Sequence, residues 1–203
     1  MLHYFYEVIL GARISLGQVP QCVAVVLNQG DLDGEGLEML GSLLGWSEAM
    51  GIHSLAIYIG EEGAELYQRI TSSLSTAPAD VSLHTSAGVV GLGRGGKVKM
   101  TISLGFGGRK EVTEATRKIL EMVEDGSLQP EEIDERTLES NLRFSQRPDL
   151  VIRAGGNRLS DFMIWQAAYS ELYFTEVNWG SVRKVDYLRA IRDYQKRQRR
   201  FGA

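Results

Sequence analysis

Two arginines and two glycines stand close together between Arg153 and Ser160, in a pattern that suits the binding of an anion. Gly155 and Gly156 permit a tight turn and a close approach of the backbone to a ligand. Arg153 and Arg158 bracket that turn, and Ser160 supplies a hydroxyl at the expected start of a helix. Guanidinium groups and the N–H groups of a helix N-terminus both bind phosphate oxygens. The segment is therefore predicted to hold a phosphate.

The residues around this turn predict a strand before it and a helix after it. Residues 150–152 (Leu-Val-Ile) form a short apolar run of strand length. The helix is expected from about Ser160, and its predicted buried side chains are Phe162, Trp165, Gln166 and Tyr169.

Further apolar runs of strand length occupy residues 23–27, 55–59, 81–84 and 98–103, and a segment with helical periodicity separates the first two. A strand–helix–strand opening of this kind predicts an α/β fold. We expect a single, mainly parallel central sheet covered by helices, with ligands at the C-terminal ends of the strands.

Other helices are predicted at residues 1–13, 65–74, 110–124, 128–142 and 185–201. The predicted apolar face of the first comprises Leu2, Phe5, Tyr6, Ile9 and Leu10. This helix is expected to dock on the body of the protein, and the alternative is contact with a membrane surface or with the mouth of a substrate site. Residues 91–96 match the spacing of a dinucleotide-binding loop, but a strand follows them, so a flexible hairpin or loop is predicted instead.

The composition is that of a soluble globular protein, with 43% hydrophobic and 24% charged residues in a chain of 203. The net charge of −4 disfavours nucleic acid as a partner. The one cysteine, Cys22, fits a reducing cytoplasm, and no apolar run approaches the roughly 18 residues of a membrane span. Residues 1–203 contain no repeat and no linker, so we expect one domain, cytoplasmic or peripheral at a membrane.

The stretch from Asp149 to Trp179 resembles the signature of the cis-prenyltransferases, the undecaprenyl and dehydrodolichyl diphosphate synthases. The matching residues are Arg153, the glycine turn, Arg158-Leu159-Ser160, the Phe-x-x-Trp-Gln run that begins at Phe162, and the run from Tyr169 to Phe174. Phe106-Gly107-Gly108-Arg109 is similar to the family's aromatic-Gly-Gly-Arg turn. Arg200 and Gly202, in the tail 196–203, are similar to its C-terminal Arg-x-Gly element.

The resemblance implies the cis-prenyltransferase fold and a chain-elongating reaction. Isopentenyl diphosphate would attack an allylic diphosphate with the help of Mg²⁺, and the product, a long-chain polyprenyl diphosphate of the dolichol or undecaprenol type, would extend into an apolar tunnel. The matched motifs assign isopentenyl diphosphate to Arg153, Arg158 and Ser160. They assign Arg200 and Gly202 to the site of a neighbouring subunit. Glu171 matches the carboxylate that helps to bind Mg²⁺.

The chain departs from the family where Mg²⁺ and the allylic diphosphate are bound. The family's first strand ends in Met-Asp-Gly-Asn-Gly, whereas this chain has Leu-Asn-Gln-Gly-Asp at 27–31, so Asn28 replaces the metal-binding aspartate. An amide has no charge to offset Mg²⁺. Asp31 or Asp33 could replace the carboxylate if the loop folds back. A basic-aromatic stretch, a Phe-Ser-x-Glu-Asn segment and one helix before residue 98 are also missing, and Gly105 replaces an expected asparagine.

Three functions are consistent with this pattern. The first is an accessory subunit of a heteromeric enzyme, similar to the Nogo-B-receptor-like partners, which has little or no activity alone and pairs with a catalytic subunit. The second is a self-sufficient homodimeric transferase with a rearranged metal site. The third is a prenyl- or phosphate-binding module outside the pathway. The substitution at Asn28 beside a surviving Arg153 turn favours the first.

Overall fold

The computed structural model describes residues 2–156 and 161–197, with side chains from Phe5 onward. Its centre is a seven-stranded sheet in the order β4-β3-β5-β2-β1-β6-β7. The strands are β1 (Cys22–Leu27), β2 (Ser54–Ile59), β3 (Asp80–Thr85), β4 (Gly88–Leu92), β5 (Lys99–Leu104), β6 (Leu150–Ala154) and β7 (Glu171–Thr175). All pairs are parallel except β3 with β4. This confirms the predicted α/β fold with a mainly parallel central sheet.

The register brings the ends of the central strands level with one another. Leu27 pairs with Ile59 across β1 and β2, and Ile59 pairs with Leu104 across β2 and β5. On the other side of β1, Val26 pairs with Arg153 of β6. The loops after β1, β2, β5 and β6 therefore emerge at one edge of the sheet, where ligands bind in folds of this type.

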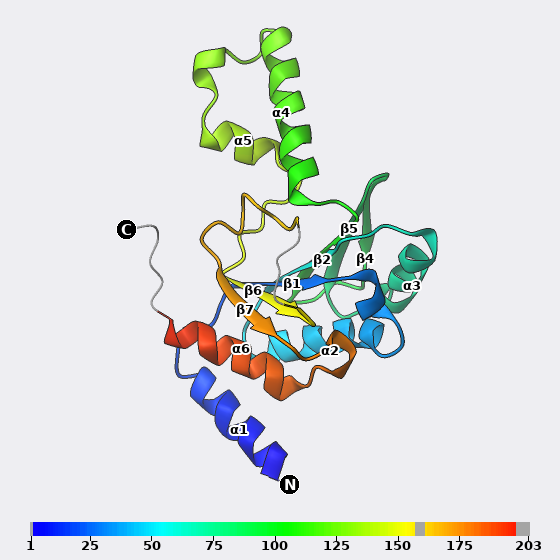
Figure 1. Ribbon diagram of the computed structural model, residues 1–203, viewed down its shortest axis with the longest axis vertical. Coiled ribbons are helices and arrows are strands. Elements are labelled where there is room, and N and C mark those ends of the chain that lie inside the picture. Colours follow the sequence, from blue (N-terminus) through cyan, green and yellow to red (C-terminus); the bar gives the residue numbers. More distant parts are fainter. Residues whose placement is uncertain (1, 157–160, 198–203) are drawn as a thin grey trace.

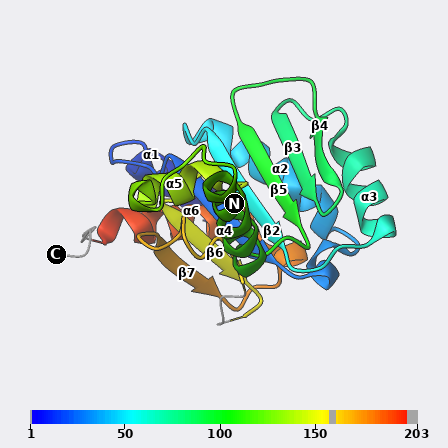
Figure 2. The same cartoon turned by 90° about the horizontal axis from the view of Figure 1, so that it is seen from above.

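Three helices, α2, α3 and α6, cover one face of the sheet (Figures 1 and 2). The helices of the described residues are α1 (Leu2–Ile14), α2 (Gly36–Ala49), α3 (Ala64–Leu74), α4 (Gly108–Glu124), α5 (Glu135–Asn141) and α6 (Lys184–Lys196), with 3-10 turns η1 (Gln29–Leu32), η2 (Pro130–Glu132) and η3 (Trp179–Ser181). Side chains of α2, α3 and α6 form the main hydrophobic core with this face, and α1 packs on α6. None of the helices in the described part of the chain is long and apolar enough to cross a membrane.

The opposite face of the sheet has a smaller core beneath irregular segments rather than helices. Phe144 and Phe162 come from two such segments and pack with Tyr58 and Phe106. Their rings cover the small side chains Ala24 and Ala56 in the centre of the sheet. The two faces are therefore packed in different ways.

The predicted helix from Ser160 is wrong for the residues that the structure describes. Residues 161–170 form turns and bends, Met163 has a φ of 29°, and Tyr169 is 69% exposed although it was expected to be buried. Phe162 and Gln166 are buried as predicted. Backbone contacts with the start of α4, including Gly108 N–H to Asp161 O at 2.7 Å, hold this segment, so tertiary contacts override its helical periodicity.

Three other predictions need correction. The flexible hairpin or loop predicted at 91–96 is a loop only from residue 93, because residues 91–92 end β4, the second arm of a hairpin with β3. The helix predicted at 128–142 is reduced to η2 and the short α5, and α4 and α5 project from the body (Figure 1). In α1, Phe5 and Ile9 are exposed, and Leu10 with Ile14 makes the buried contact instead.

Candidate functional site

Arg153 lies at the C-terminal edge of the sheet and is almost completely buried, with 8% of its surface exposed. Its Nη1 donates to Val26 O at 2.9 Å, and its Nη2 donates to Asn28 Oδ1 at 3.1 Å. Its Nε is buried without a hydrogen-bond partner, and no described carboxylate forms an ion pair with the guanidinium. A buried cation without a counter-charge is unfavourable, so this arrangement favours an anionic ligand.

The glycine turn lies directly beside this guanidinium. Gly155 has a φ of 64°, and its N–H points to Thr175 O and Val177 O at 3.0 and 3.1 Å. A Cβ added to Gly156 would lie 3.5 Å from Arg153 Nε, so a side chain there would fill the space in front of that nitrogen. Glycine at this position leaves this side of Nε without a side chain from residue 156.

The residues at the end of β1 do not fit a Mg²⁺ site. The oxygen of Asn28 that would face the metal already accepts from Arg153, and a cation placed there would meet the guanidinium charge. Among residues 2–156 and 161–197, no group of three His, Cys, Asp or Glu side chains could hold a metal. The chemistry of these donors is therefore wrong for the metal that the family implies.

Of the two aspartates considered as replacements, only Asp31 turns back towards the glycine turn. Its Oδ2 accepts from Asn28 N–H at 2.7 Å, and its Oδ1 lies 3.9 Å from the position of a Cβ on Gly155. Asp33 instead forms an ion pair with Arg69, at 3.0 Å between Nη1 and Oδ1. Asp31 alone does not make a site for Mg²⁺, because one of its oxygens already accepts from Asn28 N–H and it belongs to no group of three possible metal ligands in the described residues.

Glu171, the predicted Mg²⁺ ligand, lies at the other end of its strand. The register pairs Glu171 with Leu150 and Phe174 with Arg153, which separates Glu171 from the level of Arg153 by about 10 Å. Its carboxylate accepts from Arg197 Nη1 at 3.2 Å. Within one chain Glu171 does not join Asn28, so the metal role predicted for it needs a second subunit.

At the Gly107–Gly108–Arg109 turn, the carboxylate of Asp161 binds the start of α4. Arg109 N–H donates to Asp161 Oδ1 at 2.8 Å, and Asp161 O accepts from Gly108 N–H. A Cβ on Gly107 would clash with Asp161, which explains the glycine at this position. The Arg109 side chain is exposed. The N-terminus of α4, which could otherwise attract a diphosphate, is therefore occupied by Asp161.

A second carboxylate, Glu62, joins the loop after β2 to the turn after β3. Glu62 accepts from the N–H and the hydroxyl of Ser86, at 3.3 and 3.1 Å. Gly105, which follows β5, has a φ of 66°, and a Cβ on it would lie 2.5 Å from Glu62 Cβ. An asparagine at position 105 would be strained in this conformation, so the contact with Glu62 accounts for this departure from the family pattern.

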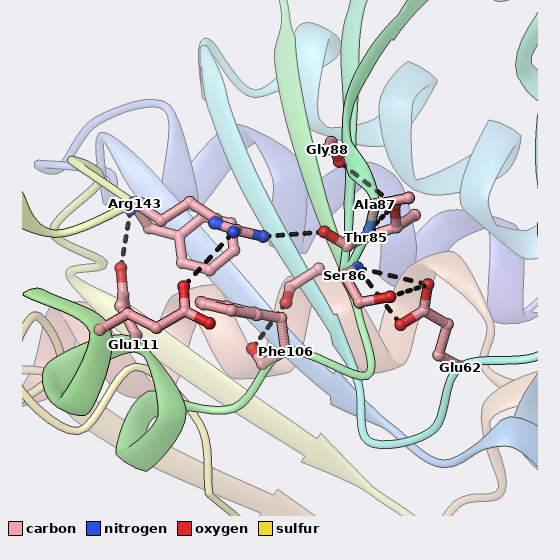
Figure 3. A network of polar contacts seen from close by, with 11 residues as sticks. Glu62, Thr85, Ser86, Ala87, Gly88, Phe106, Glu111 and Arg143 are labelled. Carbon is pink, nitrogen blue, oxygen red and sulfur yellow. Dashed lines mark hydrogen bonds and ion pairs between the residues drawn. The ribbon is translucent and has the colours of Figure 1, made fainter.

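Arg143 adds a bridge across the same region (Figure 3). Its Nη1 donates to Thr85 O at 2.8 Å, and its guanidinium lies 3.8 Å above the Phe106 ring. A weaker contact of 3.5 Å joins Nη2 to Glu114 Oε2. The side chain thus ties the end of β3 to the turn before α4.

Glu111 is a third carboxylate in this region and, unlike Glu62 and Asp161, it is fully buried; the sequence did not suggest a role for it. It accepts from Phe144 N–H at 2.7 Å and from Gln166 Nε2 at 3.1 Å. Burial raises the pKa of Glu111, against the opposing effect of these hydrogen bonds. Its spacing with Ala115 and Ile119 places it on the buried face of α4 and could have revealed it.

Four of the predicted site residues lie outside the described residues: Arg158, Ser160, Arg200 and Gly202. Two apolar cavities in the interior of the described part of the chain are also too small for the tunnel that the family implies. The cavity beneath Phe144 and Phe162 has a volume of about 10 Å³, and the cavity between β6 and α6 has a volume of about 20 Å³. A cavity that takes up benzene has a volume of about 150 Å³, so neither could hold a prenyl chain.

Comparison with known proteins agrees with this architecture. Residues 65–202 match the family described as "Putative undecaprenyl diphosphate synthase". The tritrans,polycis-undecaprenyl-diphosphate synthase (geranylgeranyl-diphosphate specific) of Methanocaldococcus jannaschii is 31% identical over 245 residues, which cover 97% of this chain and 88% of that enzyme. The alignment is longer than this chain of 203 residues, so the relative has segments that this chain lacks.

Two further matches extend the comparison. The Methanopyrus kandleri enzyme of the same name is 48% identical over 106 residues, which cover 51% of this chain and 39% of that enzyme. The crystal structure of lavandulyl diphosphate synthase from Lavandula x intermedia, in complex with dimethylallyl diphosphate, covers 91% of this chain and 99% of that one. It superposes with a TM-score of 0.73 at 24% identity, which shows a shared fold. The chain therefore belongs to the cis-prenyltransferase, or undecaprenyl diphosphate synthase, family.

Proposed function

We propose that this protein is a non-catalytic or weakly catalytic subunit of a two-component cis-polyprenyl diphosphate synthase. The observation that carries the proposal is the contact between Arg153 Nη2 and Asn28 Oδ1 at 3.1 Å. It places a fixed positive charge where the reaction of the family needs a carboxylate and Mg²⁺. Without that metal, the leaving diphosphate of an allylic substrate has no divalent cation to offset its charge.

The surroundings of the β2, β3 and β5 ends support the same conclusion. Glu62, Glu111 and Asp161 are three carboxylates that hydrogen-bond to backbone N–H groups there. Carboxylates in these positions repel an allylic diphosphate and occupy donors that could have bound it. The two interior cavities, of about 10 and 20 Å³, have no room for a growing prenyl chain.

The Arg153 turn supports a retained site for isopentenyl diphosphate. The unpartnered Nε of Arg153 and the absence of a side chain at Gly156 suit one phosphate group. In the assembled enzyme, Arg158 and Ser160 complete this site, and Arg200 and Gly202 reach the isopentenyl diphosphate of the partner. Glu171 serves Mg²⁺ only across the boundary between two subunits. The names of the archaeal relatives favour geranylgeranyl diphosphate as the allylic substrate and a long-chain polyprenyl diphosphate as the product.

The alternative is a self-sufficient homodimer with a rearranged metal site. One observation favours it: Asp31 folds back towards Gly155 and Asn28. A movement of Arg153 away from Asn28 would leave Asp31 as the carboxylate closest to the glycine turn.

The test measures the incorporation of radiolabelled isopentenyl diphosphate with geranylgeranyl diphosphate and Mg²⁺. The protein is assayed alone and mixed with a second homologue that carries the intact Asp-Gly-Asn-Gly loop. We expect incorporation by the protein alone to be at least about 100-fold below that of the mixture, since loss of metal assistance removes several kcal/mol of transition-state stabilisation. Comparable product from the protein alone contradicts the proposal.

Two variants test the proposal further: the first distinguishes an accessory subunit from a homodimer, and the second tests the C-terminal tail. Asp31→Asn should leave the mixture fully active if the protein is an accessory subunit, whereas it should abolish turnover by a homodimer that uses Asp31 for its metal. Arg200→Ala should reduce the activity of the mixture, because the proposed tail contact with the partner's diphosphate is lost. Full activity of the Arg200→Ala mixture would show that Arg200 does not contact the partner's diphosphate.

A further inference from the structure

The helix α1 carries an apolar face that no other described part of the chain covers. Phe5 is 70% exposed, Val8 55% and Ile9 45%, and Leu16 just beyond the helix is 89% exposed. Of the twelve large hydrophobic side chains that are exposed in the described residues, five fall between positions 5 and 16. A concentration of this kind marks an interaction surface rather than scattered surface residues.

The exposed face is distinct from the face with which α1 docks on α6. Phe5, Val8 and Ile9 recur at three- and four-residue intervals and therefore share one side of the helix. Leu10 and Ile14 are buried on the other side. Gln195 Nε2 of α6 donates to Ile14 O at 2.9 Å and fixes the end of α1. As a result, α1 is held along one side and lies at the periphery of the molecule (Figure 1).

Basic residues lie on α1 and on α6, the helix against which α1 packs. From Arg183 to Arg197, six basic residues stand against two acidic ones, although the chain as a whole has a net charge of −4. Both acidic residues already form ion pairs with arginines of the same segment. On α1 itself, Arg13 lies in the last turn, and Arg189 of α6 lies 5.6 Å from the centre of the Tyr6 ring.

We propose that α1 docks this protein on an anionic membrane surface, with Phe5, Val8 and Ile9 inserted at the boundary between lipid headgroups and acyl chains. A helix of thirteen residues is too short to cross a bilayer but can lie in its interface. A second copy of the chain fits the surface less well. Two-fold pairing of the same patch would bring Arg13 and Arg189 of both copies together. The basic residues of α1 and α6 instead complement lipid phosphates.

The test is co-sedimentation of the full chain with vesicles of phosphatidylcholine, with and without phosphatidylglycerol. We expect binding to the vesicles that contain phosphatidylglycerol and a loss of binding as the salt concentration is raised from about 0.1 M to about 1 M. The double variant Phe5→Gln, Val8→Gln should weaken binding at least about tenfold, because two inserted apolar side chains are lost. Both positions are exposed, so the thermal melting curve should not change.

The matched control is Val89→Gln, Val90→Gln on β4, where exposed valines lie far from α1 along the chain. This variant should bind vesicles as the unaltered protein does. If the protein does not bind the vesicles that contain phosphatidylglycerol at low salt, the proposal is overturned. An equal loss of binding in both variants also overturns it. Light scattering supplies the remaining outcome: a dimer that Phe5→Gln, Val8→Gln converts to a monomer would assign the surface to a second copy instead.

Discussion

The two halves of the C-terminal edge of the sheet differ in charge and in whether their hydrogen-bond donors already have acceptors. At the end of β6, a buried arginine and a glycine turn leave a guanidinium nitrogen without a partner. At the ends of β2, β3 and β5, Glu62, Asp161 and Glu111 occupy backbone donors, and Arg143 bridges the loops. We call these the open half and the closed half. The first is suited to an anion, and the second is filled by the protein itself.

Two departures from the family pattern lie at this edge of the sheet. Asn28 replaces the metal-binding aspartate, and Gly105 is explained by its contact with Glu62. Gly107, which matches the family pattern, is held by its close contact with Asp161. An aspartate at position 28 alone would therefore leave the contacts of Glu62 and Asp161 unchanged.

Arg153→Met in the open half should have the greatest consequence. Loss of the charge-assisted contacts should weaken the binding of isopentenyl diphosphate to this protein alone by at least about 100-fold, which corresponds to about 3 kcal/mol. Arg143→Met in the closed half is the matched control, since it also removes a guanidinium that donates to a backbone carbonyl. Calorimetric titration should show nearly unchanged affinity for that variant. Equal losses in both variants would erase the distinction between the halves.

Glu111→Ala tests how strongly the closed half is held together. The variant leaves Phe144 N–H and the Gln166 amide without their acceptor in a buried site. We expect the free energy of unfolding to fall by about 2–4 kcal/mol, as measured by urea denaturation. Glu121→Ala, on the exposed side of the same helix, should change it by less than about 0.5 kcal/mol.

Gly36→Ala probes the short loop that connects β1 to α2. A Cβ there would clash with Asp31 O and lie 3.3 Å from Trp179 Cδ1, so the variant should lose about 1–3 kcal/mol of stability. Gly41→Ala in the same helix meets nothing within 4 Å and should gain about 0.5–1 kcal/mol. Thermal denaturation of both variants gives the comparison. A stable Gly36→Ala protein would mean that the loop is freer than its contacts indicate.

The smallest predicted effect is the pH dependence contributed by Glu111. Because burial raises its pKa, the folded protein retains a proton at pH values where the unfolded chain has released it. This contribution to stability is fully present below the ordinary carboxyl pKa of about 4.3 and is lost as the pH rises through the raised value. Glu111→Gln does not titrate, so its stability relative to the unaltered protein should improve over that rise. A difference that stays constant with pH would contradict the assignment.

The sequence predicted the sheet well because its central strands are continuous apolar runs. Residues 23–27, 55–59 and 150–152 were placed correctly for that reason. Periodicity failed at 161–170, where hydrogen bonds to the start of α4 decide the conformation, and at α1, where both sides of the helix are apolar.

The site could be predicted only where a single motif contains it. Arg153 and the glycine turn are close in sequence, and their arrangement follows from a strand end and a turn. The closed half was not predicted, because Glu62 with Ser86 and Asp161 with Arg109 are pairs of residues far apart in sequence. Asn28 was recognised as a departure, but its partner Arg153 lies 125 residues away along the chain.

Calorimetric titration of this protein alone shows whether the Arg153 turn binds a diphosphate without a metal. Isopentenyl diphosphate and geranylgeranyl diphosphate are each titrated with Mg²⁺ and with a chelator. We predict that isopentenyl diphosphate binds with the same affinity in both conditions and that geranylgeranyl diphosphate shows no Mg²⁺-dependent binding. Tight binding of geranylgeranyl diphosphate that requires Mg²⁺ would show that the protein has a metal site after all.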